Sequence, residues 1–387
     1  MTRFAALFLC SFLAAPALVP AAFADDLRAT GDLGVVIERA TGSVLVIDQS
    51  EHAAIARVEG FGDLSHASLV FSNDERYAYV FGRDGGLTKL DLLTQKIVKR
   101  VLQAGNSIGG AISDDGKLIA VANYEPGGIN IFDAETLDQV AAIPAGGKAL
   151  GLEDAPGRKF LFSVWDTGET KIVDMSGPAP KVTTFADIGR EPYDALITED
   201  GRTYIAGLFG EDGLSAIDLW AKDPKPRKIL PHYGRGSEEM PVYKMPHLEG
   251  WAGAGEQIVL PAVHHHEVLW IDSRTLEETG RTETHGQPVF AMARPGGRQV
   301  WVNFAHPLND TVQVIDAMTH QVTAELKPGP AVLHMEFTAR GTEAWVSVRD
   351  ADKVVIYDTE TLKPIGEIAA KSPSGIFFTA RAHKMGL

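Results

Sequence analysis

Short apolar runs that end in an aspartate recur along the whole chain. One of them reads Val44-Leu45-Val46-Ile47-Asp48, and another reads Val354-Val355-Ile356-Tyr357-Asp358. Apolar runs of about four to eight residues bounded by turn residues are typical of β-strands. The aspartates that end these runs are Asp48, Asp91, Asp133, Asp174, Asp218, Asp272, Asp316 and Asp358.

The spacing of these aspartates predicts the fold. Six of the seven intervals between them span 41 to 44 residues, and the fifth spans 54. A repeat of about 40–45 residues is typical of a four-stranded propeller blade. We therefore predict an all-β protein in which residues 25–387 form a single eight-bladed β-propeller. A carboxylate at the end of a strand can accept hydrogen bonds from backbone amides of the following turn, so we interpret the aspartates as structural.

The two ends of the repeat array predict how the ring closes. The first repeat has no strands before Val35, whereas the tail carries a spare apolar strand at 375–379. We expect this C-terminal strand to complete the first blade, because closure protects a strand edge that an open array would expose. The long fifth interval contains an insertion around 225–255 that is rich in Pro, Gly and His. Such insertions on rigid scaffolds often carry binding sites.

The first 24 residues have the features of a signal peptide. An apolar stretch follows Arg3 and ends in Ala22-Phe23-Ala24, a small-x-small cleavage pattern. Pro16 and Pro20 interrupt the stretch, which is short for a membrane anchor. We therefore predict a signal peptide at 1–24, a periplasmic location and no membrane span.

Composition and charge exclude several classes of function. The chain carries 51 acidic and 36 basic residues, a net charge of −15, which would repel the phosphates of a nucleic acid. Cys10 is the single cysteine, so the sequence contains neither a CxxCH haem-attachment motif nor a cysteine-based zinc site. We therefore expect neither a nucleic-acid partner nor a covalent c-type haem.

Three histidines stand at similar positions in different repeats. His66, His247 and His334 each lie close to the start of a predicted inner strand. Inner strands of a propeller surround one channel, so these side chains are expected to converge, and imidazole suits iron, copper or zinc. For each histidine alone, a hydrogen-bonded structural role is the alternative. His264 and His266 form a weaker candidate metal pair.

Charged residues at strand ends are further candidates. Asp154 and Arg294 stand where other repeats carry the serine or threonine of a turn, and Asp154 could serve the same turn. Arg294 has no such structural role, and Arg83, Arg190 and Arg349 are additional candidates for binding a carboxylate, which a guanidinium grips with two hydrogen bonds.

Several segments together resemble a known family. Phe81-Gly82-Arg83-Asp84-Gly85-Gly86 is similar to a segment of the d1-haem domain of cytochrome cd1 nitrite reductase, an eight-bladed propeller. Met245-Pro246-His247, Trp345-Val346-Ser347-Val348 and the tail from Ser372 resemble further segments of that domain. Because the chain lacks the reductase's c-type cytochrome domain, it more closely resembles the exported haem d1 biosynthesis proteins of the NirF family.

The resemblance implies a function and a set of site residues. It implies a late step of haem d1 biosynthesis for denitrification, with haem d1 or its dihydro precursor as ligand and cd1 nitrite reductase or other haem d1 maturation proteins as partners. It implies that His66 and Asp154 are catalytic, and that His66 and His247 are the candidates for binding the iron. Contacts with the pigment are expected from His66, Arg83, His247, Arg294 and His334.

Alternatives remain open at this point. The protein could dehydrogenate the precursor or process a side chain of the ring, with a base near the reacting carbon. It could instead be a non-catalytic carrier that delivers haem d1 to nitrite reductase. A third alternative is an unrelated propeller, either a YncE-like periplasmic binding protein or a quinoprotein-type dehydrogenase subunit.

Overall fold

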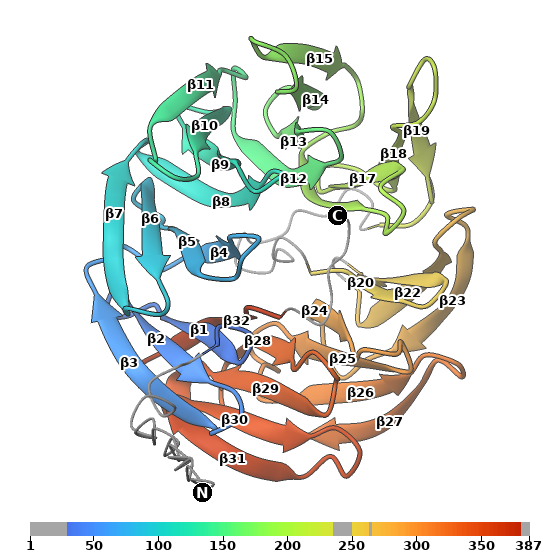
Figure 1. Ribbon diagram of the computed structural model, residues 1–387. Helices are drawn as coiled ribbons and strands as arrows, with labels where there is room; N and C mark the ends of the chain where they lie inside the picture. The colour runs from blue at the N-terminus through green and yellow to red at the C-terminus, as the bar shows by residue number, and fades with distance from the viewer. Residues whose placement is uncertain (1–28, 235–249, 263–264, 381–387) are drawn as a thin grey trace, which may run out of the picture.

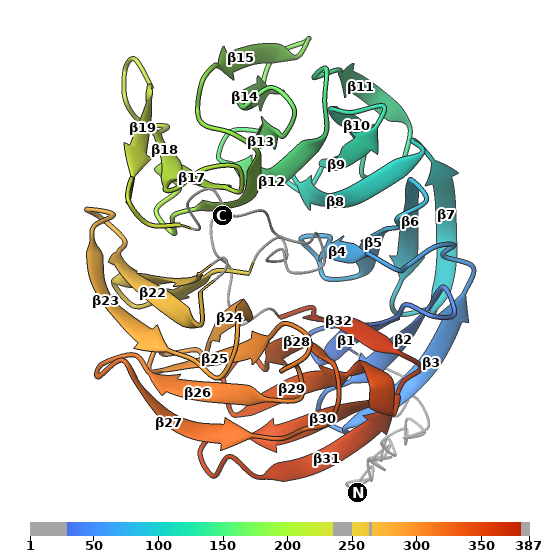
Figure 2. The same cartoon turned by 180° about the vertical axis from the view of Figure 1, so that it is seen from behind.

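The protein is a closed ring of antiparallel sheets around a central channel (Figures 1 and 2). The computed structural model describes residues 29–234, 250–262 and 265–380. Within these ranges, eight four-stranded sheets follow one another around the ring, which confirms the predicted eight-bladed β-propeller. The predicted signal peptide at 1–24 and most of the insertion lie outside the described residues.

The first blade is built from both ends of the chain. Its order from the channel outward is β32 (Pro373–Phe378), β1 (Leu33–Glu38), β2 (Ser43–Asp48) and β3 (Ala53–Glu59). Val35 of β1 pairs with Phe377 of β32 in antiparallel register. The C-terminal strand therefore completes the first blade and closes the ring, as predicted.

In each of the remaining blades, four consecutive strands run from the channel to the rim. Blade 2 contains β4 (Ser68–Phe71), β5 (Tyr77–Phe81), β6 (Gly86–Asp91) and β7 (Lys96–Leu102). Blade 3 contains β8 (Asn106–Ile112), β9 (Leu118–Glu125), β10 (Ile129–Asp133) and β11 (Gln139–Ile143). Blade 4 contains β12 (Ala149–Ala155), β13 (Lys159–Val164), β14 (Glu169–Asp174) and β15 (Lys181–Phe185).

The second half of the ring repeats this arrangement. Blade 5 contains β16 (Pro192–Ile197), β17 (Thr203–Leu208), β18 (Leu214–Asp218) and β19 (Pro226–Ile229), and blade 6 contains β20 (Ala252–Ala254), β21 (Gln257–Pro261), β22 (Glu267–Asp272) and β23 (Glu278–Glu283). Blade 7 contains β24 (Pro288–Ala293), β25 (Gln299–Phe304), β26 (Val312–Asp316) and β27 (Gln321–Leu326). Blade 8 contains β28 (Val332–Phe337), β29 (Glu343–Val348), a short 3-10 helix (Arg349–Ala351), β30 (Lys353–Asp358) and β31 (Pro364–Ala369).

The repeated aspartates end the third strand of every blade and organise the turn that follows. Asp91 accepts hydrogen bonds from the backbone N–H groups of Leu93 and Thr94 at 2.9 and 3.2 Å. Asp316 does the same for Met318 and Thr319 at 2.9 and 3.0 Å. The structural interpretation of these aspartates is therefore confirmed.

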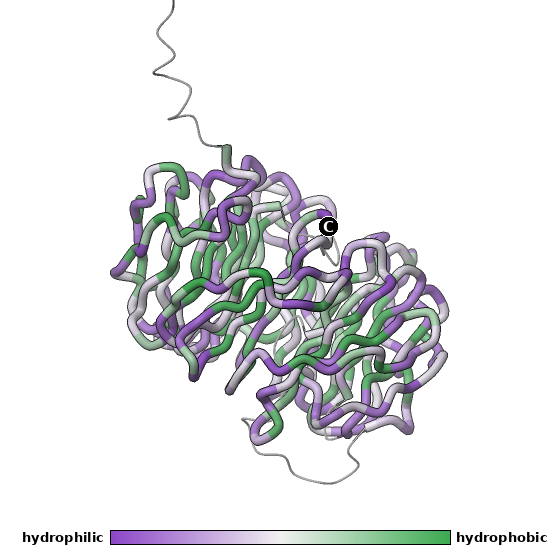
Figure 3. Tube along the Cα trace, turned by 90° about the horizontal axis from the view of Figure 1, so that it is seen from below, coloured by the Kyte–Doolittle hydropathy of each residue, from purple (hydrophilic) through white to green (hydrophobic). Residues whose placement is uncertain are grey.

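Apolar side chains pack between neighbouring blades. Trp270, Trp301 and Trp345 are wholly buried, and truncating a side chain of this size typically costs about 3–5 kcal/mol. Figure 3 shows the apolar positions along the strands in the body of the ring and the polar positions in the loops. Within the ranges that the structure describes, no helix is long and apolar enough to cross a membrane.

Candidate functional site

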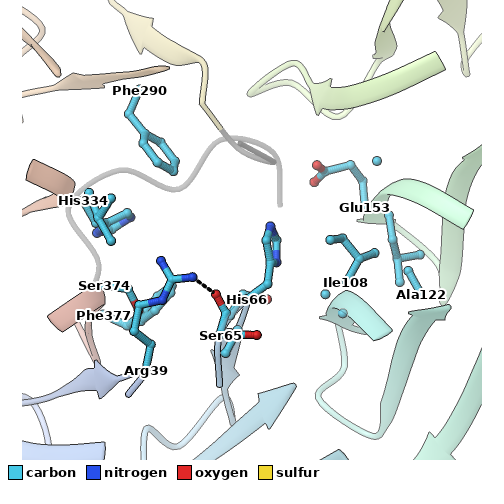
Figure 4. Close-up of a pocket in the computed structure, with 18 of the residues that line it drawn as sticks. Arg39, Ser65, His66, Ile108, Ala122, Glu153, Phe290, His334, Ser374 and Phe377 are labelled. Carbon is cyan, nitrogen blue, oxygen red and sulfur yellow. Dashed lines mark hydrogen bonds between the residues drawn. The ribbon is translucent and has the colours of Figure 1, made fainter. Parts of the chain in front are cut away.

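A cavity lies inside the channel, against the innermost strands, and we call it the channel cavity (Figure 4). Blades 1, 2, 3, 4, 7 and 8 contribute to it. The cavity exists only because the ring brings together segments from both ends of the chain. Its polar and charged lining residues are Arg39, Ser65, His66, Ser68, Glu153, His334 and Ser374.

His66 enters the channel cavity from the loop that precedes β4. Its side chain is half-buried, and Figure 4 shows its ring projecting into the cavity, as the carboxylate of Glu153 does from β12. His66 therefore lies close to the start of an inner strand and faces the channel, as expected from the sequence. An imidazole there can act as an axial ligand to a metal or exchange a proton.

His334 has a defined hydrogen-bonding role in the same cavity. Its Nδ1 accepts the backbone N–H of Ile376, with an N–N distance of 3.2 Å. Because a neutral imidazole has one donor and one acceptor nitrogen, Nε2 then carries the proton. The ring stacks on Phe377 at 5.5 Å and meets the edge of Phe290 at 5.2 Å. In this state His334 is a hydrogen-bond donor, not a metal ligand.

Arg39 supplies a positive charge that sequence analysis missed. It follows β1 directly, lines the cavity and donates a hydrogen bond to the carbonyl oxygen of Ser65 (Figure 4). Burial lowers the pKa of Arg39, and the nearby Arg349 lowers it further. An arginine nevertheless stays charged at neutral pH, so this half-buried guanidinium favours an anionic ligand group.

The rest of the cavity wall consists of apolar side chains and glycines. Phe290, Met292, Ile108, Ala122, Leu152 and Phe377 line it, together with Gly109, Gly110, Gly151 and Gly375. A Cβ atom at Gly110 would collide with the Phe81 ring and with the carbonyl oxygen of Ala120. Glycine is therefore required at this point of close packing.

The structure places Asp154 outside the lining of the channel cavity. Asp154 lies in β12 opposite Phe160, while its neighbour Glu153 lines the cavity. The register of β12 against β13 shifts between Leu150 and Glu153, and a shift of this kind changes which residues of a strand face inward. A catalytic role for Asp154 stays a prediction.

Two arginines that were predicted to contact the pigment make other contacts in the structure. The Arg83 guanidinium lies 5.7 Å from the centre of the Tyr124 ring, and Arg83 does not line the cavity. Arg294 follows β24, donates to the carbonyl oxygen of Gly341 at 2.8 Å and pairs with Glu360 of blade 8 at 2.5 Å. Their contacts with a pigment stay predictions.

The remaining metal candidates are not brought together in the described part of the chain. His247 and His264 lie outside it. Within it, no group of three or more His, Cys, Asp or Glu side chains is arranged to hold a metal ion.

Curated proteins that share one name are similar to this chain over nearly its whole length. The chain is 58% identical over 384 residues to a protein named NirF from Stutzerimonas stutzeri, covering 97% of this chain and 98% of that protein. It is 59% identical over 370 residues to a protein of the same name from Pseudomonas aeruginosa strain PAO1, covering 93% and 94%.

A solved structure has the same architecture. The structure described as dihydro-heme d1 dehydrogenase NirN in complex with DHE has a TM-score of 0.79 and 25% sequence identity, covering 92% of this chain and 77% of that chain. The family model described as cytochrome D1 heme domain matches residues 28–382. The resemblance inferred from the sequence is therefore confirmed, and this chain belongs to the cytochrome D1 heme domain family, with proteins named NirF among its relatives.

Proposed function

We propose that this protein binds haem d1 or its dihydro precursor in the channel cavity and acts in a late step of haem d1 biosynthesis. The observation that supports this most directly is the lining of one cavity by an imidazole, a guanidinium and broad apolar walls. Haem d1 and its precursors are flat tetrapyrroles with an apolar centre and carboxylate side chains, and iron in such rings accepts an axial imidazole.

Each polar group has a distinct task in this proposal. His66 would bind the iron of the pigment, because its ring projects into the cavity (Figure 4). Arg39 would pair with a carboxylate of the ring. His334 donates a hydrogen bond from Nε2, since Nδ1 is held by Ile376.

Conversion of a bound precursor would draw on the same residues. Removing two hydrogens from a dihydro precursor releases two protons and two electrons, so it requires groups that accept the protons and a separate acceptor for both electrons. Glu153 projects a carboxylate into the cavity and is the candidate proton acceptor on geometry, and Asp154 beside it keeps its predicted role in catalysis. If no such conversion takes place, the same cavity serves a carrier.

The proposed location rests on the predicted signal peptide, and the proposed partners rest on the family resemblance. We propose that residues 1–24 direct export, that the propeller works in the periplasm and that the pigment passes to cd1 nitrite reductase or to another maturation protein. Transfer of the pigment from the loaded propeller to apo-reductase, followed by the gain of nitrite reduction, tests this step.

A visible-light titration tests the binding site. Protein lacking residues 1–24 would be mixed with haem d1 and, separately, with the dihydro precursor. We expect a stoichiometric spectral shift that is lost in His66→Ala and kept in His232→Ala, because His232 is exposed and does not line the cavity. A later drift of the precursor spectrum toward haem d1 would identify an enzyme, and a static shift would identify a carrier. No shift with either pigment would overturn the proposal.

A further inference from the structure

The loop that carries His66 is fastened by an ion pair at the rim of the same blade. Arg100 of β7 donates to Asp84 at 2.6 Å and to the carbonyl oxygen of Phe61 at 3.2 Å. Asp84, in the turn between β5 and β6, accepts the backbone N–H groups of Asp63 at 3.3 Å and Gly86 at 3.0 Å. One ion pair therefore joins the loop at 60–66, the β5–β6 turn and the outer strand.

Further hydrogen bonds connect Asp84 to Ser65, the residue that precedes His66. Arg83 donates its backbone N–H to the carbonyl oxygen of Asp63 at 2.8 Å. The Asp63 carboxylate accepts the backbone N–H of Ser65 at 2.8 Å, and these hydrogen bonds from Ser65 lower the pKa of Asp63. The carbonyl oxygen of Ser65 accepts a hydrogen bond from Arg39. Asp84 is thus connected through Asp63 and Ser65 to the backbone that carries His66.

Glycines make room for the ion pair. A Cβ atom at Gly62, whose φ is +79°, would collide with the Asp84 carboxylate and the Arg100 guanidinium. A Cβ atom at Gly86 would likewise collide with the Arg100 guanidinium, and one at Gly82 would lie 2.9 Å from Asp84 Oδ1. Two of these glycines and Asp84 belong to the segment 81–86, which carries part of the family resemblance. The segment is shaped to hold a charged pair against the His66 loop.

We propose that Asp84 and Arg100 are positioning residues that fix His66 for binding the tetrapyrrole. The inference rests on the proposed function and adds how the axial ligand is held. The strand ladders of blade 2 do not pass through Asp84, since β4 to β7 pair with one another along their own backbones. Loss of Asp84 should therefore free the loop without dismantling the blade. Ligand geometry held by such supporting contacts is needed for full affinity.

A double-mutant cycle tests this inference. Haem d1 affinity would be measured by quenching of the intrinsic tryptophan fluorescence, which does not require the bond between His66 and the iron, for wild type, Asp84→Ala, His66→Ala and the double variant. We expect Asp84→Ala to weaken binding about 10-fold and to reduce the His66-dependent spectral band. If Asp84 acts through His66, the double variant will bind as His66→Ala alone does. Equal losses from Asp84→Ala in both backgrounds, or no loss in either, would overturn the inference.

A matched control and a second variant guard against a general loss of stability. Asp91→Asn removes the negative partner of Arg76, a 2.8 Å pair in the same blade that does not contact the His66 loop, and it should leave affinity and spectrum unchanged. Arg100→Gln removes the same ion pair from the side of the outer strand. It should show the changes expected of Asp84→Ala, and it replaces that variant if Asp84→Ala does not fold. A wild-type protein without His66-dependent binding would overturn the proposed function itself, whereas an intact wild-type band with an additive cycle would overturn only this inference.

Discussion

The carboxylate of Glu38 accepts the backbone N–H of Lys371 at 2.7 Å, across almost the full length of the chain. Glu38 is wholly buried at the end of β1, and Lys371 is separated from the C-terminal strand by Ser372 alone. The same carboxylate accepts two hydrogen bonds from Arg57, at 2.6 and 2.8 Å, and one from Ser43 at 2.8 Å. One side chain therefore joins the second, third and outer strands of blade 1 to the segment that closes the ring.

Replacing Glu38 by alanine should weaken this closure. Arg57, Ser43 and the Lys371 N–H would lose their shared acceptor, which we expect to cost about 2–3 kcal/mol in the free energy of unfolding. Urea unfolding followed by tryptophan fluorescence measures the loss. Glu278→Ala is the control, because Glu278 also binds an arginine with two hydrogen bonds but on an exposed outer strand. Equal losses in both variants would contradict a special role for Glu38 in closure.

Acid should unfold the wild type partly through Glu38. Burial opposes ionisation, but the hydrogen bonds from Arg57, Lys371 and Ser43 outweigh it and lower the pKa of Glu38 from its usual 4.5. A carboxyl group whose pKa is lower in the folded state stabilises the fold above 4.5 and loses that contribution as the pH falls toward the folded pKa. We expect the Glu38→Ala variant to show a shallower fall in unfolding temperature below this pH. Identical pH profiles would contradict this assignment.

The two arginines Arg39 and Arg294 should differ in their effect on pigment binding. Arg39 lines the channel cavity, whereas Arg294 is engaged by Gly341 and Glu360 in an interblade contact. We expect Arg39→Gln to weaken haem d1 binding about 10-fold, as for the loss of a charged hydrogen bond of about 1.4 kcal/mol, and Arg294→Gln to leave it nearly unchanged. Spectral titration measures both. The reverse order would favour the sequence-based role of Arg294.

His334 should contribute to affinity without acting as the axial ligand. His334→Phe keeps an aromatic ring beside Phe290 and Phe377 but removes the Nε2–H donor. We expect weaker binding with the His66-dependent spectral band retained at saturation. Loss of that band in His334→Phe would show that His334, and not only His66, ligates the iron.

His320 should make the unfolding temperature depend on pH between about pH 5 and pH 7. Its ring stacks on Trp270 with centroids 4.2 Å apart, and burial lowers the pKa of His320 from its usual 6.5. The folded state therefore favours the neutral ring, and stability is present above 6.5 and falls as the pH drops below it. His320→Asn, which suits the left-handed backbone at φ +56°, should flatten the unfolding temperature between about pH 7 and pH 5. The exposed His232→Asn is the control, and an unchanged slope in His320→Asn would contradict the prediction.

The fold could be predicted because one strand signal repeats in every blade. The aspartates from Asp48 to Asp358 end the strands β2, β6, β10, β14, β18, β22, β26 and β30, as their spacing indicated. The reason is local, since each carboxylate holds the turn that follows it. A local rule of this kind is visible in the sequence alone.

The site was predictable only where a residue stands at a regular position. His66 and His334 belong to the loops and strands that face the channel, and the structure brings both to one cavity. Arg39 carries no comparable signal, because its contact with Ser65 depends on how blade 1 packs against blade 2. Glu153 was missed since the register shift in β12 cannot be read from alternation of apolar and polar residues.

Closure by the C-terminal strand also sets when the protein becomes functional during its synthesis. Ser374, Gly375 and Phe377 line the channel cavity, and Ile376 fixes the proton of His334. All four residues belong to β32, one of the last segments of the chain to be made. A chain interrupted before this strand has neither a finished first blade nor a complete cavity wall. The order of the strands along the chain therefore matters for the site, because only a chain that extends through β32 has a complete cavity wall.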